Sequence, residues 1–502
     1  MTVKPLSPSY NDSISPFSHD LYVKNLIRFS KESAMKLNVQ TVIFLAITFI
    51  TEVHSRSFAQ DAGRIKSRPN VLIIVADDLN ADLGCYGNQV VKTPHIDRLA
   101  ARGVRFEHAY CQGTVCNSSR ASIFSGLHPL TTNVLDNETS WPDRLVNCEY
   151  MPAYFQQSGY FTASLGKVLD HKRVPEQPYW DHEVKEWGKS PDEDQIYRQG
   201  RLYSDSPGSM FWAELKGTDE TTPDGEIALK AVQLLHDRRN SDQAYFIAVG
   251  FRRPHTPYAV PRKYFDLYEP ERIQIPEVPQ GYSETLPPGV KDWKPFAGGP
   301  DETKHAIAAY YACISFVDEQ VGRVLNVVDE LDLWQDTVVM FISDHGYHTG
   351  HNGLWHKGWL FEQTTRTPMI VAAPHRPAGV CRRIVEFVDI YPTLAELCGL
   401  EPQAALAGES FVPLLEDPQA EWNRNALSST AVLDEENRRL FLGKSVRNTA
   451  YRYTEWDGGN EGKELYSFAD DSAGLRNRAD DPSLATIRQK MREQLHAMCE
   501  GL

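Results

Sequence analysis

Short apolar runs alternate with helical patterns from about residue 69 onward. Four of the runs are apolar almost throughout, as is typical of strands covered on both faces; they are Val71–Ala76, Tyr245–Gly250, Val338–Ser343 and Met369–Ala373. Segments with apolar residues at helical spacing accompany them, at Pro94–Ala101, Ser118–Gly126, Met151–Ser158, Gly225–Arg238, Thr303–Leu331 and Ile390–Leu397. This alternation predicts an α/β domain with a largely parallel sheet.

The hydrophobic pattern changes after about residue 425. Short alternating segments (LSSTAV, KSVRNTAYRYTEW and KELYSF) are followed by a charged helical stretch, Leu484–Met498. Such alternation is typical of strands with one covered face. We therefore predict a large α/β domain over residues 60–425 and a small α+β domain with an antiparallel sheet over 426–502. The stretch from 256 to 300 is rich in Pro and Gly and is predicted to be a long connecting loop.

One segment near the N-terminus has the character of a signal peptide. Val42–Ile50 is an apolar run, interrupted only by Thr48, that is too short to span a bilayer, and Lys36 precedes it. Ser57 and Ala59 are small residues at the −3 and −1 positions of a possible signal-peptide cleavage site before Gln60. We predict that residues 1–59 are a leader, with Met35 as an alternative start, and that the protein is exported to the periplasm or beyond without a membrane segment in its mature form. A short buried helix or strand is the alternative interpretation.

Composition narrows the class of protein. The hydrophobic content of 41% and the charged content of 24% are ordinary for a folded soluble chain. The formal net charge of −15 disfavours nucleic acid and anionic lipid as partners. It does not exclude a small anionic substrate, because a few cations inside a cleft can reverse the local field. The 8 cysteines form no C-x-x-C pair and are too sparse for a disulfide-held scaffold.

Two of the predicted strands end in acidic residues. The first runs into Asp77-Asp78, and the third runs into Asp344-His345. Because ligands of open α/β sheets bind outside the carboxyl ends of the strands, these side chains predict a shared cation site. Hard carboxylate ligands favour Ca²⁺ or Mg²⁺ over a softer metal. The alternative is that each Asp only caps the helix that follows.

A cysteine opens the second predicted helix. Cys116 is placed at the helix N-terminus, where unpaired N–H groups and the helix dipole suit anion chemistry. Arg120 follows four residues later and is expected on the same helix face. Alone, this pattern also fits a buried cysteine that acts as a small hydrophobe.

The sequence around these residues resembles one enzyme family. VCNSSRASIFSG is similar to the sulfatase signature C-x-P-S-R-x-x-x-x-x-G. It lies among NVLIIVADDLNADLGCYGNQVVKTPHIDRLAARGVRFEHAY, GYFTASLGKV, GFRRPHTPY, SDHGYHTGHNGLWHKGWLFEQTTRTPMIV and TAYRYTEW…ELYSF, which occur in family order over roughly residues 69–480. The chain is thus identified as resembling formylglycine-dependent sulfatases of the alkaline-phosphatase-like superfamily, most of all the iduronate-2-sulfatase branch and its bacterial relatives.

This resemblance implies an alkaline-phosphatase-like α/β/α sandwich and a set of site residues. A formylglycine-generating enzyme would oxidise Cys116 to formylglycine, whose hydrate attacks the sulfur of the ester. One cation, Ca²⁺ rather than Mg²⁺, would be bound by the modified Cys116 with four further residues, which are Asp77, Asp78, Asp344 and His345. Arg120 would orient the hydrate.

The resemblance also assigns the remaining polar residues. Lys167 and Lys357 would neutralise the sulfate oxygens, and His255 would lie near the ester oxygen as general acid. His171 would assist sulfate expulsion, although it comes one residue later than the Lys-x-x-His spacing of the relatives. Ser118 replaces the Pro of the signature, which bears on how Cys116 is recognised for oxidation. The alternative interpretation is that Lys167 and Lys357 are ordinary exposed lysines and that His255 is a histidine in a turn.

The sequence therefore predicts hydrolysis of O-sulfate esters, with a sulfated sugar such as a glycosaminoglycan or an algal polysaccharide as substrate. Loops at 132–150, 175–222 and 256–300 are expected to recognise the sugar. Two rivals stay open. One is a phosphonate or phosphate ester hydrolase of the same fold, although the single metal cluster disfavours a two-zinc phosphatase. The other is a non-catalytic sulfatase-like binding protein, suggested by Ser118.

Overall fold

The computed structural model describes most of the chain after residue 67. The described residues are 68–141, 144, 148–170, 179–185, 191–202, 211–291, 298–401, 406–434 and 439–502. The leader predicted at 1–59 and the candidate site residue His171 lie outside them. Lys66–Leu502 forms one compact unit. Within the described part of this unit, no helix combines the length and hydrophobicity that a membrane crossing requires.

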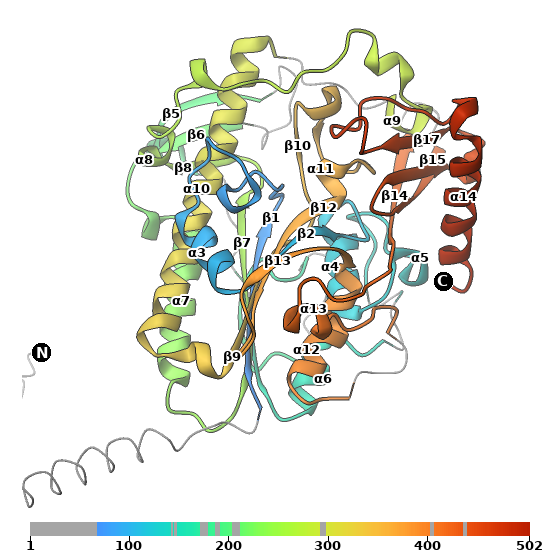
Figure 1. The fold of residues 1–502 in the computed structure, drawn as a ribbon. Coiled ribbons are helices and arrows are strands. Elements are labelled where there is room, and N and C mark those ends of the chain that lie inside the picture. The colour runs from blue at the N-terminus through green and yellow to red at the C-terminus, as the bar shows by residue number, and fades with distance from the viewer. Residues whose placement is uncertain are drawn as a thin grey trace, which may run out of the picture. The chain divides into compact units, whose positions relative to one another are not determined.

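An eight-stranded sheet forms the centre of this unit (Figure 1). In spatial order its strands are β13 (Gly379–Glu386), β2 (Val104–Tyr110), β12 (Arg366–Ala372), β9 (Thr337–Ser343), β1 (Asn70–Asp77), β7 (Tyr245–Pro254), β3 (Phe161–Gly166) and β4 (His182–Val184). Neighbouring strands are parallel, except that β12 runs antiparallel to both β2 and β9. The predicted, mostly parallel sheet is confirmed, and all four predicted strands belong to it.

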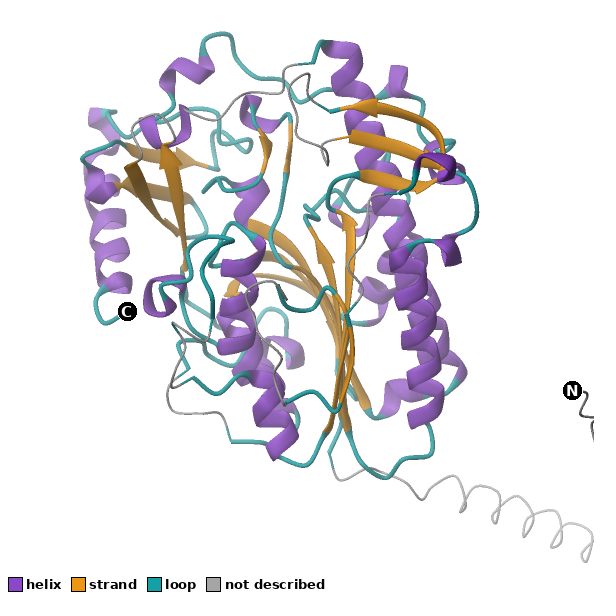
Figure 2. Cartoon of the chain, turned by 180° about the vertical axis from the view of Figure 1, so that it is seen from behind, coloured by secondary structure: helices purple, strands orange, loops and turns teal. Residues whose placement is uncertain are grey.

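Helices cover both faces of the sheet (Figure 2). Every residue of β1 is buried, because alternate side chains enter two different cores. Leu72 and Ile74 pack with α3 (Pro94–Arg102), α7 (Pro223–Arg238) and α10 (Pro300–Glu330). Val71 and Ile73 pack with α4 (Cys116–Ser125), α6 (Met151–Gln157), α12 (Ile390–Leu397) and α13 (Val412–Glu416). The predicted helices are confirmed, with ends that differ by at most three residues.

The C-terminal part forms a separate antiparallel sheet, as the alternating segments predict. Its strands are β14 (Ala426–Asp434), β15 (Arg439–Arg447), β16 (Tyr451–Trp456) and β17 (Lys463–Ser467). Helix α14 (Ala485–Cys499) buries Met491 and Leu495 against Leu427 and Val446 of this sheet. The domain boundary at residue 425 stays a prediction.

The long loop predicted at 256–300 is confirmed only in part, because short regular elements interrupt it. This stretch contains β8 (Tyr258–Pro261), α8 (Arg262–Phe265) and α9 (Pro288–Lys291). Strand β8 pairs with β6 (Phe211–Leu215), which pairs in turn with β5 (Ile196–Arg201). The prolines of this stretch are compatible with regular structure because Pro is tolerated at strand ends and in the first turn of a helix. Shorter elements are α5 (Pro129–Thr132), β10 (His348–Thr349), β11 (Trp355–His356) and α11 (Glu362–Thr365).

Candidate active site

The two acidic strand ends lie side by side at one edge of the central sheet. Strands β1 and β9 are parallel neighbours, so Asp77-Asp78 and Asp344-His345 leave the sheet together. Oδ1 of Asp344 accepts hydrogen bonds from the main-chain N–H of Asp78 (3.2 Å) and of His345 (2.9 Å). Asp78 has a left-handed backbone, with φ of 65°, which Asp and Asn adopt more readily than most residues. The Asp344 carboxylate thereby ties the two strand ends to one another.

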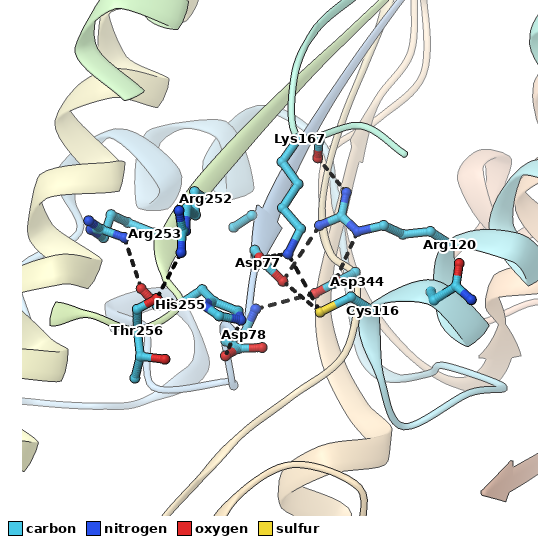
Figure 3. A network of polar contacts seen from close by, with 12 residues as sticks. Asp77, Asp78, Cys116, Arg120, Lys167, Arg252, Arg253, His255, Thr256 and Asp344 are labelled. Carbon is cyan, nitrogen blue, oxygen red and sulfur yellow. Dashed lines mark hydrogen bonds and ion pairs between the residues drawn. The ribbon is translucent and has the colours of Figure 1, made fainter. Parts of the chain in front are cut away.

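Helix α4 brings two further predicted residues to the same edge (Figure 3). Cys116 is the first residue of α4 and Arg120 lies one turn later, so both face the strand ends. The Cys116 Sγ atom lies 3.3 Å from Asp77 Oδ1 and 3.4 Å from His345 Nε2. Arg120 Nε donates to Asp344 Oδ2 at 3.0 Å. The helix start and the acidic strand ends therefore form one buried cluster.

Lys167 enters the cluster from the end of β3. The preceding Gly166 has a positive φ of 76°, and a Cβ at this position would lie 2.2 Å from the carbonyl oxygen of Gly250. Only glycine therefore lets β3 turn this close to β7. The turn directs Lys167 Nζ to Asp77 Oδ2, with which it forms an ion pair, and places it 3.6 Å from Cys116 Sγ.

Lys357 and His255 approach the second carboxylate of the pair, Asp78. Lys357 Nζ forms an ion pair with Asp78 Oδ1 and donates to Cys116 Sγ at 3.0 Å. His255 Nε2 lies 3.8 Å from Asp78 Oδ2. The other ring nitrogen of His255, Nδ1, lies 2.7 Å from the Thr256 carbonyl oxygen. Burial lowers the pKa of His255 well below its usual value, and Lys357 lowers it further. The imidazole is therefore neutral at pH 7, with its Nδ1 proton donated to Thr256.

The buried charges of the cluster balance one another formally. Three carboxylates face three cations, namely Asp77, Asp78 and Asp344 against Arg120, Lys167 and Lys357. Burial acts to raise the pKa of Asp77, but the cations Lys167, Lys357 and Arg120 help to hold it well below its usual value. Burial raises the pKa of Asp78 more than Lys357 lowers it. The Asp78 charge is thus only partly neutralised by the protein, and a bound cation would stabilise it.

Four side chains are close enough to bind one metal ion together. One ligand atom from each lies within 4.8 Å of the others, and the four residues are Asp77, Asp78, Cys116 and His345. Carboxylate oxygens suit a hard divalent cation. A thiol suits such an ion less well. If residue 116 carried an oxygen in place of its sulfur, it would add one more oxygen ligand to those of the two carboxylates. The residues present therefore fit a hard cation together with an oxidised residue 116.

The structure thus gathers all the predicted site residues that it describes, and His171 is the one outside the described residues. Asp344 differs from the four residues above, because its carboxylate already binds Arg120 and two main-chain N–H groups. Its role as a metal ligand stays a prediction, as do the catalytic roles of the other residues.

Thr430 of the C-terminal sheet is a contributor that the sequence analysis missed. Its hydroxyl accepts from Thr114 Oγ1 at 2.8 Å and donates to the Gly358 carbonyl at 3.3 Å. Gly358 N–H in turn donates to the Thr114 carbonyl at 3.1 Å. Thr114 lies two residues before Cys116, and Gly358 directly follows Lys357. Thr430 therefore sets the spacing between the segments that carry these two site residues.

Replacing Thr430 with Val is expected to lower kcat about 5- to 10-fold, because about 1 kcal/mol of hydrogen bonding that holds this spacing is lost. Thr430→Ser keeps the hydroxyl and serves as the matched control, with kcat near that of the wild type. Rates are measured well below the melting temperature of each variant. An unchanged kcat in Thr430→Val would show that the hydroxyl does not position the site.

Comparison with protein-family models gives two overlapping matches. The model described as "Sulfatase" matches residues 69–400. The model described as "N-sulphoglucosamine sulphohydrolase, C-terminal" matches residues 350–501. Together they cover the central sheet, the cluster at its edge and the C-terminal sheet.

Curated relatives agree with this assignment. A "Sulfatase" of Formosa agariphila is 32% identical over 448 residues, which cover 82% of this chain and 83% of the relative. The "Iduronate 2-sulfatase" of Homo sapiens is 30% identical over 493 residues, which cover 81% of this chain and 88% of the relative.

Solved structures share the fold at lower identity. A phosphonate monoester hydrolase from Silicibacter pomeroyi matches with a TM-score of 0.74 at 20% identity, covering 86% of this chain and 95% of that one. A "2-O GAG sulfatase" matches with a TM-score of 0.67 at 23% identity, covering 86% and 91%. These likenesses show the alkaline-phosphatase-like fold alone. Since the family model spans most of the chain, the protein belongs to the sulfatase family and is a hydrolase of that family.

Proposed function

We propose that the protein hydrolyses O-sulfate esters of a sulfated carbohydrate, with formylglycine at position 116 and one bound Ca²⁺. The observation that carries this proposal is the convergence of Cys116 with two carboxylates and two lysines in one buried cluster. A sulfate group has three oxygens that need cationic partners. The cluster contains three fixed cations that can serve this purpose, namely Lys167, Lys357 and Arg120.

The proposed groups would supply two kinds of chemistry. Formylglycine would supply a hydrated aldehyde as nucleophile, and Ca²⁺ would polarise a sulfate oxygen. Asp77, Asp78 and His345 would hold the cation, while Arg120 and the lysines would hold the oxygen atoms on residue 116 and on the sulfate.

The charge balance of the cluster supports this assignment. The charges of its carboxylates and cations cancel. Binding of a divalent cation would give the site a net charge of plus two, and binding of a sulfate monoester as well would reduce this net charge to plus one. That remaining charge favours a transition state in which further negative charge develops as the alcohol departs. The His255 side chain is 25% exposed, so it lies at the solvent side of the cluster. There it would lie beside the oxygen of the departing alcohol. A bound anionic ester also raises the pKa of this imidazole, which favours the protonated form that a general acid needs.

The carbohydrate substrate is supported by the relatives' names. The curated relatives include "Iduronate 2-sulfatase" and "Ulvan-active sulfatase", and a similar fold belongs to a "2-O GAG sulfatase". We further propose that the chain is exported and that a formylglycine-generating enzyme acts on Cys116, as the leader pattern and the signature indicate.

One experiment tests the reaction and its nucleophile together. The protein is expressed with a formylglycine-generating enzyme, and the peptide that contains residue 116 is examined by mass spectrometry. We expect an aldehyde at residue 116, and hydrolysis of an aryl sulfate about 100-fold faster than of the matched phosphonate and phosphate esters. Cys116→Ala should abolish turnover, whereas Cys111→Ala, a second buried cysteine, serves as the matched control and should retain it.

Two results would contradict the proposal in different ways. Faster hydrolysis of the phosphonate monoester would favour the rival activity, for which the solved fold with a TM-score of 0.74 is the specific support. An unmodified thiol in native protein without turnover would favour a binding protein.

A further inference from the structure

The exposure of the site residues identifies the open side of the cluster. The side chains of Asp77 and Asp78 are 0% and 2% exposed, those of Lys167 and Lys357 are 14% exposed, and that of His255 is 25% exposed. Solvent therefore reaches the cluster past His255. A sulfate ester bound by the buried cations would extend its alcohol part in the same direction.

Two consecutive arginines precede His255 at the end of β7, and the structure separates their roles. The carboxylate of Asp224 accepts from the main-chain N–H of Arg252 (2.8 Å) and of Arg253 (2.9 Å), which fixes this strand end. The Arg253 side chain is 7% exposed and donates to the carbonyl oxygens of His255 (2.9 Å) and Ala259 (3.0 Å). Arg253 thus stabilises the fold of the turn.

Arg252 instead lies at the open side, beside His255. Its side chain is partly exposed, and its Nη2 donates to the Thr256 carbonyl at 3.3 Å. Figure 3 shows Arg252 on the His255 side of the cluster, away from Arg120. The same Thr256 carbonyl oxygen lies 2.7 Å from His255 Nδ1, so the Arg252 and His255 side chains meet at one carbonyl group. Arg252 is therefore within electrostatic reach of any ligand that passes His255.

Binding of a single sulfate group does not require Arg252 as a further cation. Lys167, Lys357 and Arg120 already contact the cluster in which the sulfate is proposed to bind. A fourth cation at the opening would meet the substituents of the alcohol part instead. A guanidinium group presents N–H donors in a planar fork that matches carboxylate and sulfate oxygens.

We propose that Arg252 binds a second anionic group, a carboxylate or a second sulfate, on the sugar that carries the scissile sulfate. This inference rests on the proposed function and narrows its substrate class to sugars with two acidic groups. Arg252 is a specificity-determining residue in this proposal, and it takes no part in bond cleavage.

The test uses two matched pairs of substrates. The first pair is a 2-O-sulfated uronate disaccharide and its carboxyl-reduced derivative. The second pair is a disulfated hexosamine and the hexosamine with the scissile sulfate alone. Sulfate release is measured for the wild type and three variants. Arg252→Gln removes the charge and Arg252→Lys keeps the charge without the fork. Arg102→Gln removes an exposed arginine at the end of α3, outside the segments expected to recognise the sugar, and serves as the control.

We expect wild-type kcat/KM to favour the member with two acidic groups in one of the pairs by about 10- to 100-fold, as a charged hydrogen bond implies. The pair that shows the preference identifies the second group as carboxylate or sulfate. Arg252→Gln should bring that ratio close to one, Arg252→Lys should give an intermediate ratio, and Arg102→Gln should match the wild type.

Three outcomes would overturn the inference. A wild type without preference in either pair, or an unchanged ratio in Arg252→Gln, refutes the second anion site alone. An equal loss on both members of a pair in Arg252→Gln indicates a structural role and also refutes it. A wild type that hydrolyses an aryl sulfate but releases no sulfate from any of these sugars refutes the inference alone. One that hydrolyses neither refutes the proposed function and the inference with it.

Discussion

Asparagine in place of Asp78 is expected to lower turnover of an aryl sulfate by about 1000-fold or more. The carboxylate is a proposed ligand of the cation and the partner of Lys357. Its loss removes several kcal/mol of charge stabilisation from the site. Asparagine is the informative replacement because Asp and Asn both tolerate the left-handed backbone found here, so the strand end is retained. Bound cation per chain should fall together with kcat/KM, and both are measured well below the melting temperature of each variant.

Asp82→Asn provides the matched control for this prediction. Asp82 lies four residues further along and accepts from the side-chain amides of Asn80 (2.9 Å) and Asn88 (3.0 Å), outside the buried cluster. We expect this variant to keep its cation and its turnover. Wild-type turnover or wild-type cation content in Asp78→Asn would rule out the ligand role of Asp78.

Glutamine in place of Glu362 is expected to destabilise the protein by about 3–5 kcal/mol, because it leaves two buried arginines without their shared carboxylate. Glu362 Oε1 accepts from Arg447 Nε and from Arg452 Nη2, both at 2.7 Å, and the arginines are 4% and 1% exposed. Glu362 belongs to α11, which directly precedes β12 of the central sheet, and the arginines belong to β15 and β16 of the C-terminal sheet. The free energy of unfolding in urea measures the effect. Glu416→Gln, which breaks the exposed pair with Arg376, should cost less than about 1 kcal/mol.

The stabilisation by Glu362 should also depend on pH. Burial alone would raise the pKa of Glu362, but Arg447 and Arg452 together lower it well below its ordinary value of 4.5. A carboxyl with a lowered folded-state pKa stabilises the fold above its unfolded pKa, and this contribution is lost as the pH falls. The difference in unfolding free energy between wild type and Glu362→Gln should therefore shrink below about pH 4.5. A difference that stays constant into acid would show that the Glu362 charge is not its cause.

The site could be predicted from the sequence where local patterns carry the information. The runs that end in Asp77-Asp78 and Asp344-His345 are apolar on both faces, and parallel strands deliver their carboxyl ends to one edge. The position of Cys116 at a helix start was likewise encoded locally. These local patterns were sufficient to predict that the acidic strand ends share one edge of the sheet and that Cys116 begins a helix.

Other features could not be predicted because they depend on distant contacts. A strand buried on both faces, such as Met369–Ala373, reads the same in either direction, so the antiparallel orientation of β12 left no trace in its composition. Adjacent residues Arg252 and Arg253 are chemically equal in sequence. In the structure Arg253 is buried and donates to two carbonyl groups, whereas Arg252 is partly exposed. Thr430 has no signal of its own, since its partner Thr114 lies 316 residues away.

That separation has a consequence for the order of events during synthesis. The segment before Cys116 is bonded to β14, so its final geometry awaits a strand made 316 residues later. At ordinary translation rates this interval lasts roughly 15 to 60 seconds. Strand β1 likewise waits for β9 before its acidic end is enclosed. The Cys116 thiol is almost completely buried in the finished protein, and this interval would leave it open to the oxidation that we propose.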